Sequence, residues 1–118
     1  MFIERLSEIS GRIEGALGLS LVAGDGITVE SVSSSPDLEL DLLSAELVTQ
    51  VKAIGENHRD LAAGDVHQLT VTTDRMTVMV SSVSDSYYLV LVLAGDGNHG
   101  RARFELRRAR LLLEADLA

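Results

Sequence analysis

The sequence has no cysteine and no tryptophan, and only one proline and one lysine. Without cysteine, disulfides, thiolate metal sites and cysteine nucleophiles are excluded, and a reducing compartment is favoured. The longest apolar run, Tyr87 to Ala94, is far shorter than the roughly 20 residues that cross a membrane. The first residues lack the basic-then-apolar order of a signal peptide. We therefore expect a cytoplasmic protein that does not insert into a membrane.

The 118 residues are 46% hydrophobic and 24% charged, which is typical of one globular domain spanning residues 1–118. The net charge is −8, and this makes nucleic acid a poor partner because binding to phosphates needs a basic surface. The positive charge is concentrated in one place, however. Five arginines lie between residues 101 and 110, so the rest of the chain is more acidic.

The spacing of apolar residues predicts the secondary structure. Helical periodicity appears in residues 2–13, in a long segment 38–63 that Ser35 or Asp37 could cap, and from Ala102 to the end. Period-two alternation predicts strands at 17–23, 27–32, 66–73 and 76–81. Gly24-Asp25-Gly26 is a strong hairpin signal because such turns need positive φ. The expected order is therefore α-β-β-α-β-β-β-α.

Residues 87–93 are continuously apolar, which indicates a central strand covered on both faces. Tight turns between strands favour an antiparallel sheet of five strands. Helices on both faces then give a three-layer α-β-α domain, an α/β fold of the α+β type.

The segment 38–63 has a wider apolar surface than an ordinary surface helix needs. One apolar stripe consists of Leu40, Leu43, Leu47, Val51 and Ile54. A second set of apolar side chains widens it: Leu42, Ala45, Val48 and Ala53. This breadth indicates burial on two sides, against the sheet of the same chain and against a partner.

Residues 95–100, Gly-Asp-Gly-Asn-His-Gly, match the G-x-G-x-x-G pattern that places a pyrophosphate at a helix N-terminus. The complete fingerprint also needs a following parallel strand and an acidic residue about 20 positions on. The printed sequence ends in the last helix without them. We therefore favour a glycine-rich turn, with Asn98 near the helix start, over nucleotide binding.

No other pattern points to catalysis or to a cofactor. His58, His67 and His99 are scattered without metal-ligand spacing, and the sequence has no G-x-S-x-G elbow. We expect no enzyme, no metal and no cofactor. The arginine cluster could bind an anionic partner, but pairs such as Glu105–Arg108 and Arg110–Glu114 favour a solvated, partly self-paired surface.

Taken together, these features resemble the Roadblock family, which includes dynein Roadblock light chains and MglB-type proteins. The resemblance covers nearly the whole chain. It rests on the order of elements, on the strand and hairpin Leu19-Ser20-Leu21-Val22-Ala23-Gly24-Asp25-Gly26-Ile27, on the broad second helix, and on Asn98-His99-Gly100-Arg101-Ala102-Arg103 before the last helix.

The resemblance implies a profilin-like Roadblock fold and a homodimer, in which second helices pack side by side and third strands join two sheets into one. The positions that would form this interface are Leu43, Leu47, Val51, Ile54, Leu69 and Val71. We expect Leu47→Asp or Val51→Asp to break the dimer.

The resemblance also implies a small Ras-like GTPase as partner, bound over the paired second helices. The chain would then be a GTPase-activating partner at most, with no catalytic residues of its own. Glu46, Gln50 and Glu56 are the polar positions that carry over. Two alternatives stay open: a ligand-sensing module of PAS-like or profilin-like shape, and a dimeric scaffold for a kinase-like or motor partner.

Overall fold

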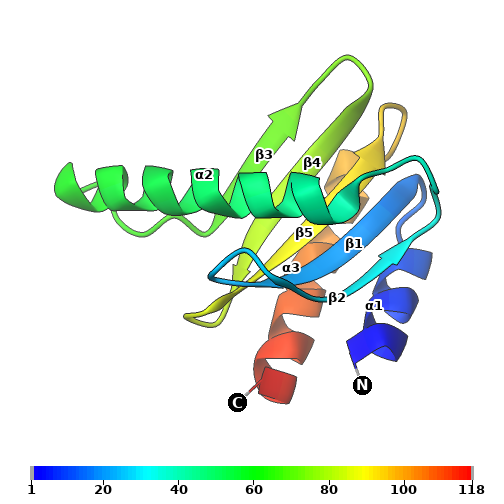
Figure 1. Ribbon diagram of the computed structural model, residues 1–118, viewed down its shortest axis with the longest axis horizontal. Coiled ribbons are helices and arrows are strands. Elements are labelled where there is room, and N and C mark those ends of the chain that lie inside the picture. The colour runs from blue at the N-terminus through cyan, green and yellow to red at the C-terminus, as the bar shows by residue number, and fades with distance from the viewer. Residues whose placement is uncertain (1, 118) are drawn as a thin grey trace.

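The computed structural model describes residues 2–117, which form three helices and five strands in the predicted order (Figure 1). The helices are α1 (Phe2–Gly11), α2 (Leu40–Asp60) and α3 (His99–Leu117). The strands are β1 (Ala16–Ala23), β2 (Thr28–Ser33), β3 (Gln68–Thr72), β4 (Met76–Val83) and β5 (Tyr87–Ala94).

The five strands form one antiparallel sheet in the order β2-β1-β5-β4-β3. The apolar strand β5 lies at the centre, as its sequence predicted, and Leu89 to Leu93 are fully buried. A strand paired on both edges and covered on both faces favours apolar side chains at every position, which is why its sequence does not alternate.

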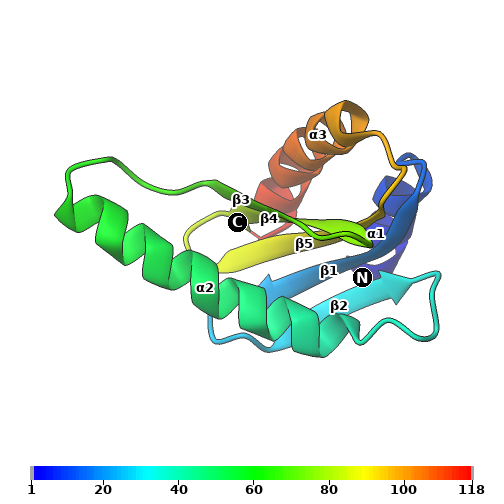
Figure 2. The same ribbon diagram turned by 90° about the horizontal axis from the view of Figure 1, so that it is seen from above.

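Helices cover both faces, so the predicted three-layer architecture is confirmed (Figure 2). Successive side chains of β5 point to opposite faces of the sheet and so contribute to two separate cores. Leu89, Leu91 and Leu93 pack with α1 and α3, whereas Val90 and Val92 pack with α2. The helix α2 crosses its face of the sheet, and its C-terminal end extends beyond the strands (Figure 1). None of the described helices is long and apolar enough to cross a membrane.

The start of α2 differs from the predicted one. The helix begins at Leu40 rather than Leu38, and the predicted caps are wrong because Glu39 occupies the N-cap position without a side-chain hydrogen bond. The amide of Leu38 instead donates to the Ser35 carbonyl at 3.2 Å, and its side chain packs against the core. Burial of Leu38 therefore holds a turn where the periodicity predicted helix.

The end of α2 is also earlier than predicted, at Asp60 rather than Ala63. Ala62 adopts a φ of 57°, and the amide of Ala63 donates back to the His58 carbonyl at 2.8 Å. A left-handed residue with a backward hydrogen bond closes a helix. Here Ala62 is the left-handed residue, so α2 ends before Gly64, the glycine that would ordinarily be expected to terminate it.

Candidate interaction surface

The strand β3 leaves one edge of the sheet open. Among the described strands it pairs only with β4, in an uninterrupted register from Gln68↔Ser81 to Thr72↔Thr77. Its five residues, Gln-Leu-Thr-Val-Thr, carry no charge. An unpaired, regular and uncharged edge is a template on which another strand can form hydrogen bonds.

The opposite edge, β2, is less suited to such pairing. Its register against β1 shifts between Leu21 and Val22, so β2 holds an extra residue there, and Glu30 places a charge on the strand. Bulges and charges are devices that keep sheet edges from pairing. The two edges are therefore not equivalent, and β3 is the one available to a partner.

One flank of α2 is fixed to its own domain. Lys52 Nζ donates to the Gly24 carbonyl at 2.8 Å, and Thr28 Oγ1 donates to an Asp41 carboxylate oxygen at 3.0 Å. A Cβ on Gly26 would contact Ala45 at 3.8 Å. Residues 41, 45 and 52 follow one side of the helix, which therefore faces the β1–β2 hairpin.

The other flank of α2 is only partly covered. Leu43 and Ile54 are half-buried, and Gln50 lies exposed between them. These positions follow helical spacing and form a stripe on the side away from the β1–β2 hairpin. Three half-buried residues of β3 and β4 pack against the same core cluster as Leu43: they are Leu69, Val71 and Met76. We call Leu43, Ile54, Leu69, Val71 and Met76 the α2–β3 surface.

The predicted interface residues therefore fall into two groups. Leu43, Ile54, Leu69 and Val71 lie on the α2–β3 surface, where a partner could cover them. Leu47 and Val51 are 6% and 4% exposed, because they already pack against the sheet of their own chain. The broad apolar surface of α2 is partly explained by that packing, and its role in a dimer interface stays a prediction.

The three polar positions predicted to contact a partner are all exposed. Glu46 and Gln50 are one turn apart and lie toward the open flank. Glu56 lies about a third of a turn away from Gln50. It lines a surface cleft of about 360 Å³ together with Lys52, Arg59 and residues of the β4–β5 hairpin. The structure therefore groups Glu46 with Gln50 but not with Glu56. The sequence pattern placed Leu42 in the broad apolar surface expected to be buried, but Leu42 is 67% exposed on the outer side of α2.

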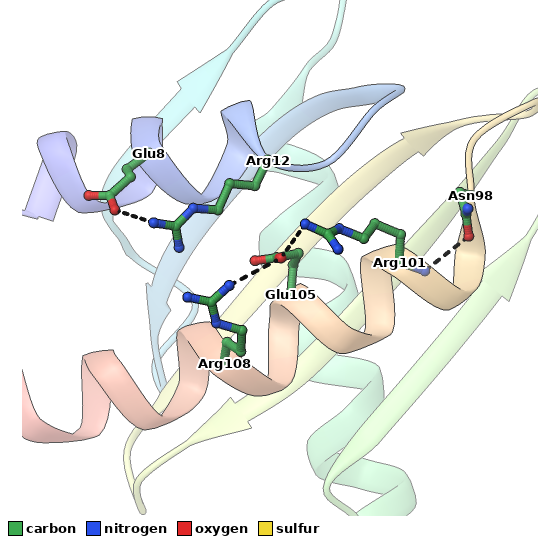
Figure 3. A network of polar contacts seen from close by, with 6 residues as sticks. All are labelled: Glu8, Arg12, Asn98, Arg101, Glu105 and Arg108. Atoms are coloured by element: carbon green, nitrogen blue, oxygen red, sulfur yellow. Dashed lines mark hydrogen bonds and ion pairs between the residues drawn. The ribbon is translucent and has the colours of Figure 1, made fainter.

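The glycine-rich segment 95–100 is a turn packed against the domain. A Cβ on Gly15 would lie 3.1 Å from Gly97 Cα, and the Ala94 amide donates to the Gly15 carbonyl at 2.8 Å. Asn98 lies at the start of α3 as expected, and its Oδ1 accepts a hydrogen bond from the Arg101 amide at 3.0 Å (Figure 3), which caps the helix. Helix capping and close packing therefore account for this motif.

The polar residues of α3 form an ion-pair network. Glu105 is 1% exposed, and its Oε1 lies 3.0 Å from Arg101 and 3.5 Å from Arg108 (Figure 3). Both guanidinium groups also lie near the centre of the Phe104 ring, at 5.7 and 6.0 Å. Burial of a carboxylate without such partners is strongly destabilising. The predicted Glu105–Arg108 pair is present, but the burial of Glu105 was not predicted.

The second predicted pair on α3 joins Arg110 to Glu114 at 3.0 Å. Hydrogen bonding from the Arg110 side chain, and then from the Ser84 amide, holds the pKa of Glu114 below its ordinary value of 4.5. This pair thereby links α3 to the turn after β4.

In residues 2–117 no three His, Asp or Glu side chains gather into a group that could hold a metal ion. His99 instead contacts Thr77 Oγ1 through its Nε2 at 3.2 Å. His58 Nδ1 lies 3.0 Å from the Ile54 carbonyl of its own helix.

Comparisons with known proteins agree with this architecture. The family model described as the Roadblock/LC7 domain matches residues 3–93. MglC from Myxococcus xanthus is 32% identical, with 98% of each chain covered and a TM-score of 0.72. Two further structures share the fold at lower identity. A Roadblock/LC7 domain from Streptomyces avermitilis is 18% identical, with 95% of this chain and 93% of that chain covered and a TM-score of 0.85.

The second is the gliding protein MglB from Thermus thermophilus, which is 21% identical, with 96% of this chain and 85% of that chain covered and a TM-score of 0.85. No curated protein matches the chain.

Proposed function

The chain belongs to the Roadblock/LC7 domain family, and from that premise we propose that it is a homodimeric adaptor or regulator of a small Ras-like GTPase. The observation that carries this proposal is the regular, uncharged β3 edge beside the half-buried α2 flank. Both features leave binding capacity unused in a single chain: backbone groups without strand partners and apolar side chains only partly removed from water.

A second copy satisfies both features with one symmetric contact. Pairing β3 with β3 of the partner chain supplies the missing backbone hydrogen bonds. The same arrangement packs the open flanks of the two α2 helices side by side. Leu43 and Ile54 of each chain are then covered by the partner chain. In a two-fold interface each surface meets its own copy, which requires self-complementarity. An uncharged strand and an apolar flank meet that requirement, since no like charges are brought together.

The GTPase would then bind the outer side of the paired α2 helices. There the chain offers exposed Leu42 with Glu46 and Gln50, an apolar contact flanked by polar groups. Similarity to MglB and MglC and the family resemblance support this partner class. In this proposal the chain supplies no catalytic group, and any stimulation of GTP hydrolysis comes from positioning groups of the GTPase itself.

Calorimetric titration of purified Ras-like GTPases of the source organism, loaded with GDP or with a non-hydrolysable GTP analogue, tests the proposal. We expect one of them to bind with a preference for one nucleotide state. Glu46→Lys should weaken that binding about tenfold or more while the dimer stays intact, because Glu46 lies outside the α2–β3 surface. The matched control is Glu14→Lys, at an exposed position after α1, which should bind as the wild type does.

Two results would count against this function. One is the absence of binding to every Ras-like GTPase by a chain that is shown to be dimeric, which would favour a scaffold for another partner. The other is an equal loss of binding in the Glu14→Lys control. The ligand-sensing alternative needs a hollow between helix and sheet. That layer is occupied by buried side chains such as Val48, Val51 and Val90, so the structure does not favour it.

A further inference from the structure

A second surface lies on the opposite face of the sheet, where α3 passes the β3–β4 edge. A cleft of about 180 Å³ is lined there by His67, Gln68, Ser81, Arg103, Leu106, Arg107 and Arg110. Three arginines and a histidine line this cleft, and no carboxylate does. This lining is unusual for a chain with 18 acidic and 10 basic residues.

Two of these arginines have no ion-pair partner in the described structure. Arg101 and Arg108 pair with Glu105, and Arg110 pairs with Glu114. Arg103 and Arg107 are exposed and form no ion pair with any residue of 2–117. They are one helical turn apart, where like charges destabilise each other. An anion bound between them would relieve that repulsion.

Exposed apolar side chains adjoin these charges. Phe104 is 51% exposed and Leu111 is 65% exposed. They are separated by two turns on the outer side of α3, and Arg107 lies between them at helical spacing. Large apolar side chains that stay exposed in a row beside unpaired charges are typical of a contact surface.

We propose that the α3 basic surface, defined as Arg103, Phe104, Arg107, Arg110 and Leu111, binds an acidic peptide segment of a partner protein. Carboxylates of the segment pair with the guanidinium groups of Arg103 and Arg107 at the cleft, with the bidentate geometry that arginine favours. Apolar side chains of the segment cover Phe104 and Leu111. Because α3 and α2 lie on opposite faces of the sheet, this site is separate from the proposed GTPase surface (Figure 2).

The charge distribution favours a narrow peptide over an anionic membrane or a nucleic acid. The helix α3 has five arginines and three acidic residues, so its net charge is +2, and the rest of the chain carries a net charge of −10. An extended anionic surface would meet the acidic remainder of the domain as well as α3. A single helix or strand can contact α3 alone.

Fluorescence anisotropy with a labelled model peptide tests this proposal on the full chain. The probe is a designed helix of about 20 residues, with leucines along one stripe and glutamates on both sides of it. We expect saturable binding that weakens as salt rises. Arg103→Gln combined with Arg107→Gln should weaken peptide binding about tenfold, since two charge-assisted contacts are lost. Arg103→Lys combined with Arg107→Lys should retain part of the affinity, because the positive charges stay in place.

The matched control is Arg59→Gln combined with Arg75→Gln, which makes the same change in net charge away from the cleft. This control should bind as tightly as the wild type. Phe104→Ser combined with Leu111→Ser should also weaken binding, because the apolar contact is removed. Circular dichroism should show all these exposed-site variants to be folded.

The proposal is overturned if the wild type does not bind the peptide, or if the Arg59 and Arg75 control loses as much affinity as the cleft variant. It is also overturned if a peptide with the same residues in scrambled order binds equally well, which would indicate charge attraction alone. Displacement of the peptide by inorganic phosphate at low concentration would overturn it by assigning the cleft to a small anion. Tighter binding to vesicles of anionic lipid would overturn it by assigning the surface to a membrane.

Discussion

A Cβ placed on Gly97 would lie 2.5 Å from Cγ of Leu93, a separation at which atoms must move. Leu93 is fully buried at the end of the central strand β5, so its side chain is held by the core on the side of α1 and α3. The middle glycine of the G-x-G-x-x-G pattern is thereby explained by close packing of the turn on the strand, without a nucleotide.

Gly97→Ala should lower the free energy of unfolding by about 1–3 kcal/mol, the usual cost of forcing an extra methyl group into a filled site. Urea unfolding followed by circular dichroism measures this change. Gly100→Ala is the control from the same motif: a Cβ there meets only Asn98 Oδ1, at 3.5 Å, and alanine favours the helix. If both substitutions had equal effects, the packing explanation for Gly97 would be wrong.

Asn98→Ala should destabilise the domain by about 1 kcal/mol, because the Arg101 amide loses its capping acceptor at the first turn of α3. Asn98→Asp should restore most of the loss, since a carboxylate caps equally well and suits the positive end of the helix dipole. The measurement is the urea midpoint of the three proteins. An unchanged midpoint in the alanine variant would show that the cap seen at Asn98 does not contribute.

Glu114→Gln should make the protein less stable at neutral pH and have no such effect in strong acid. The folded state lowers the pKa of Glu114 through Arg110 and the Ser84 amide, so the unfolded chain takes up its proton first as pH falls. The contribution is therefore fully present above the ordinary pKa of 4.5 and is lost as the pH passes through the lowered value. Thermal unfolding of both proteins from neutral to strongly acidic pH should converge at the acidic end. A difference independent of pH would contradict this assignment.

The order of elements and the position of β5 could be predicted because they depend on local periodicity and on the apolar run of residues 87–93. The ends of α2 could not, since Leu38 is held by tertiary burial and Ala62 adopts a left-handed φ without a glycine. Both causes lie outside the local apolar pattern.

The candidate surfaces show the same limit. The apolar breadth of α2 was visible in the sequence, but periodicity does not reveal which apolar side chains the sheet of the same chain already covers. Leu47 and Val51 proved to be core residues, and Ile54 remained half-buried. The basic cleft could not be predicted either, because it requires His67 and Gln68, which lie before and in β3, to meet arginines of α3 that are distant in the sequence.

Ile54→Asp should convert the dimer into a folded monomer. Ile54 is half-buried on the open flank, so a carboxylate there can stay hydrated in one chain but would be buried without a partner between two. Asp at Leu47 or Val51 would instead disrupt the core and cannot separate dimerisation from folding. The control is Ile27→Asp, the same chemical change at a residue that is 66% exposed in the turn before β2. We expect that variant to remain dimeric, as judged by sedimentation velocity.

The most direct measurement is the mass of the wild-type chain in solution, determined by light scattering across a range of concentrations. We expect about twice the 12.7 kDa of one chain, with dissociation only on dilution. A mass of 12.7 kDa at every concentration would mean that the β3 edge and the α2 flank stay open, and would contradict the proposed dimer.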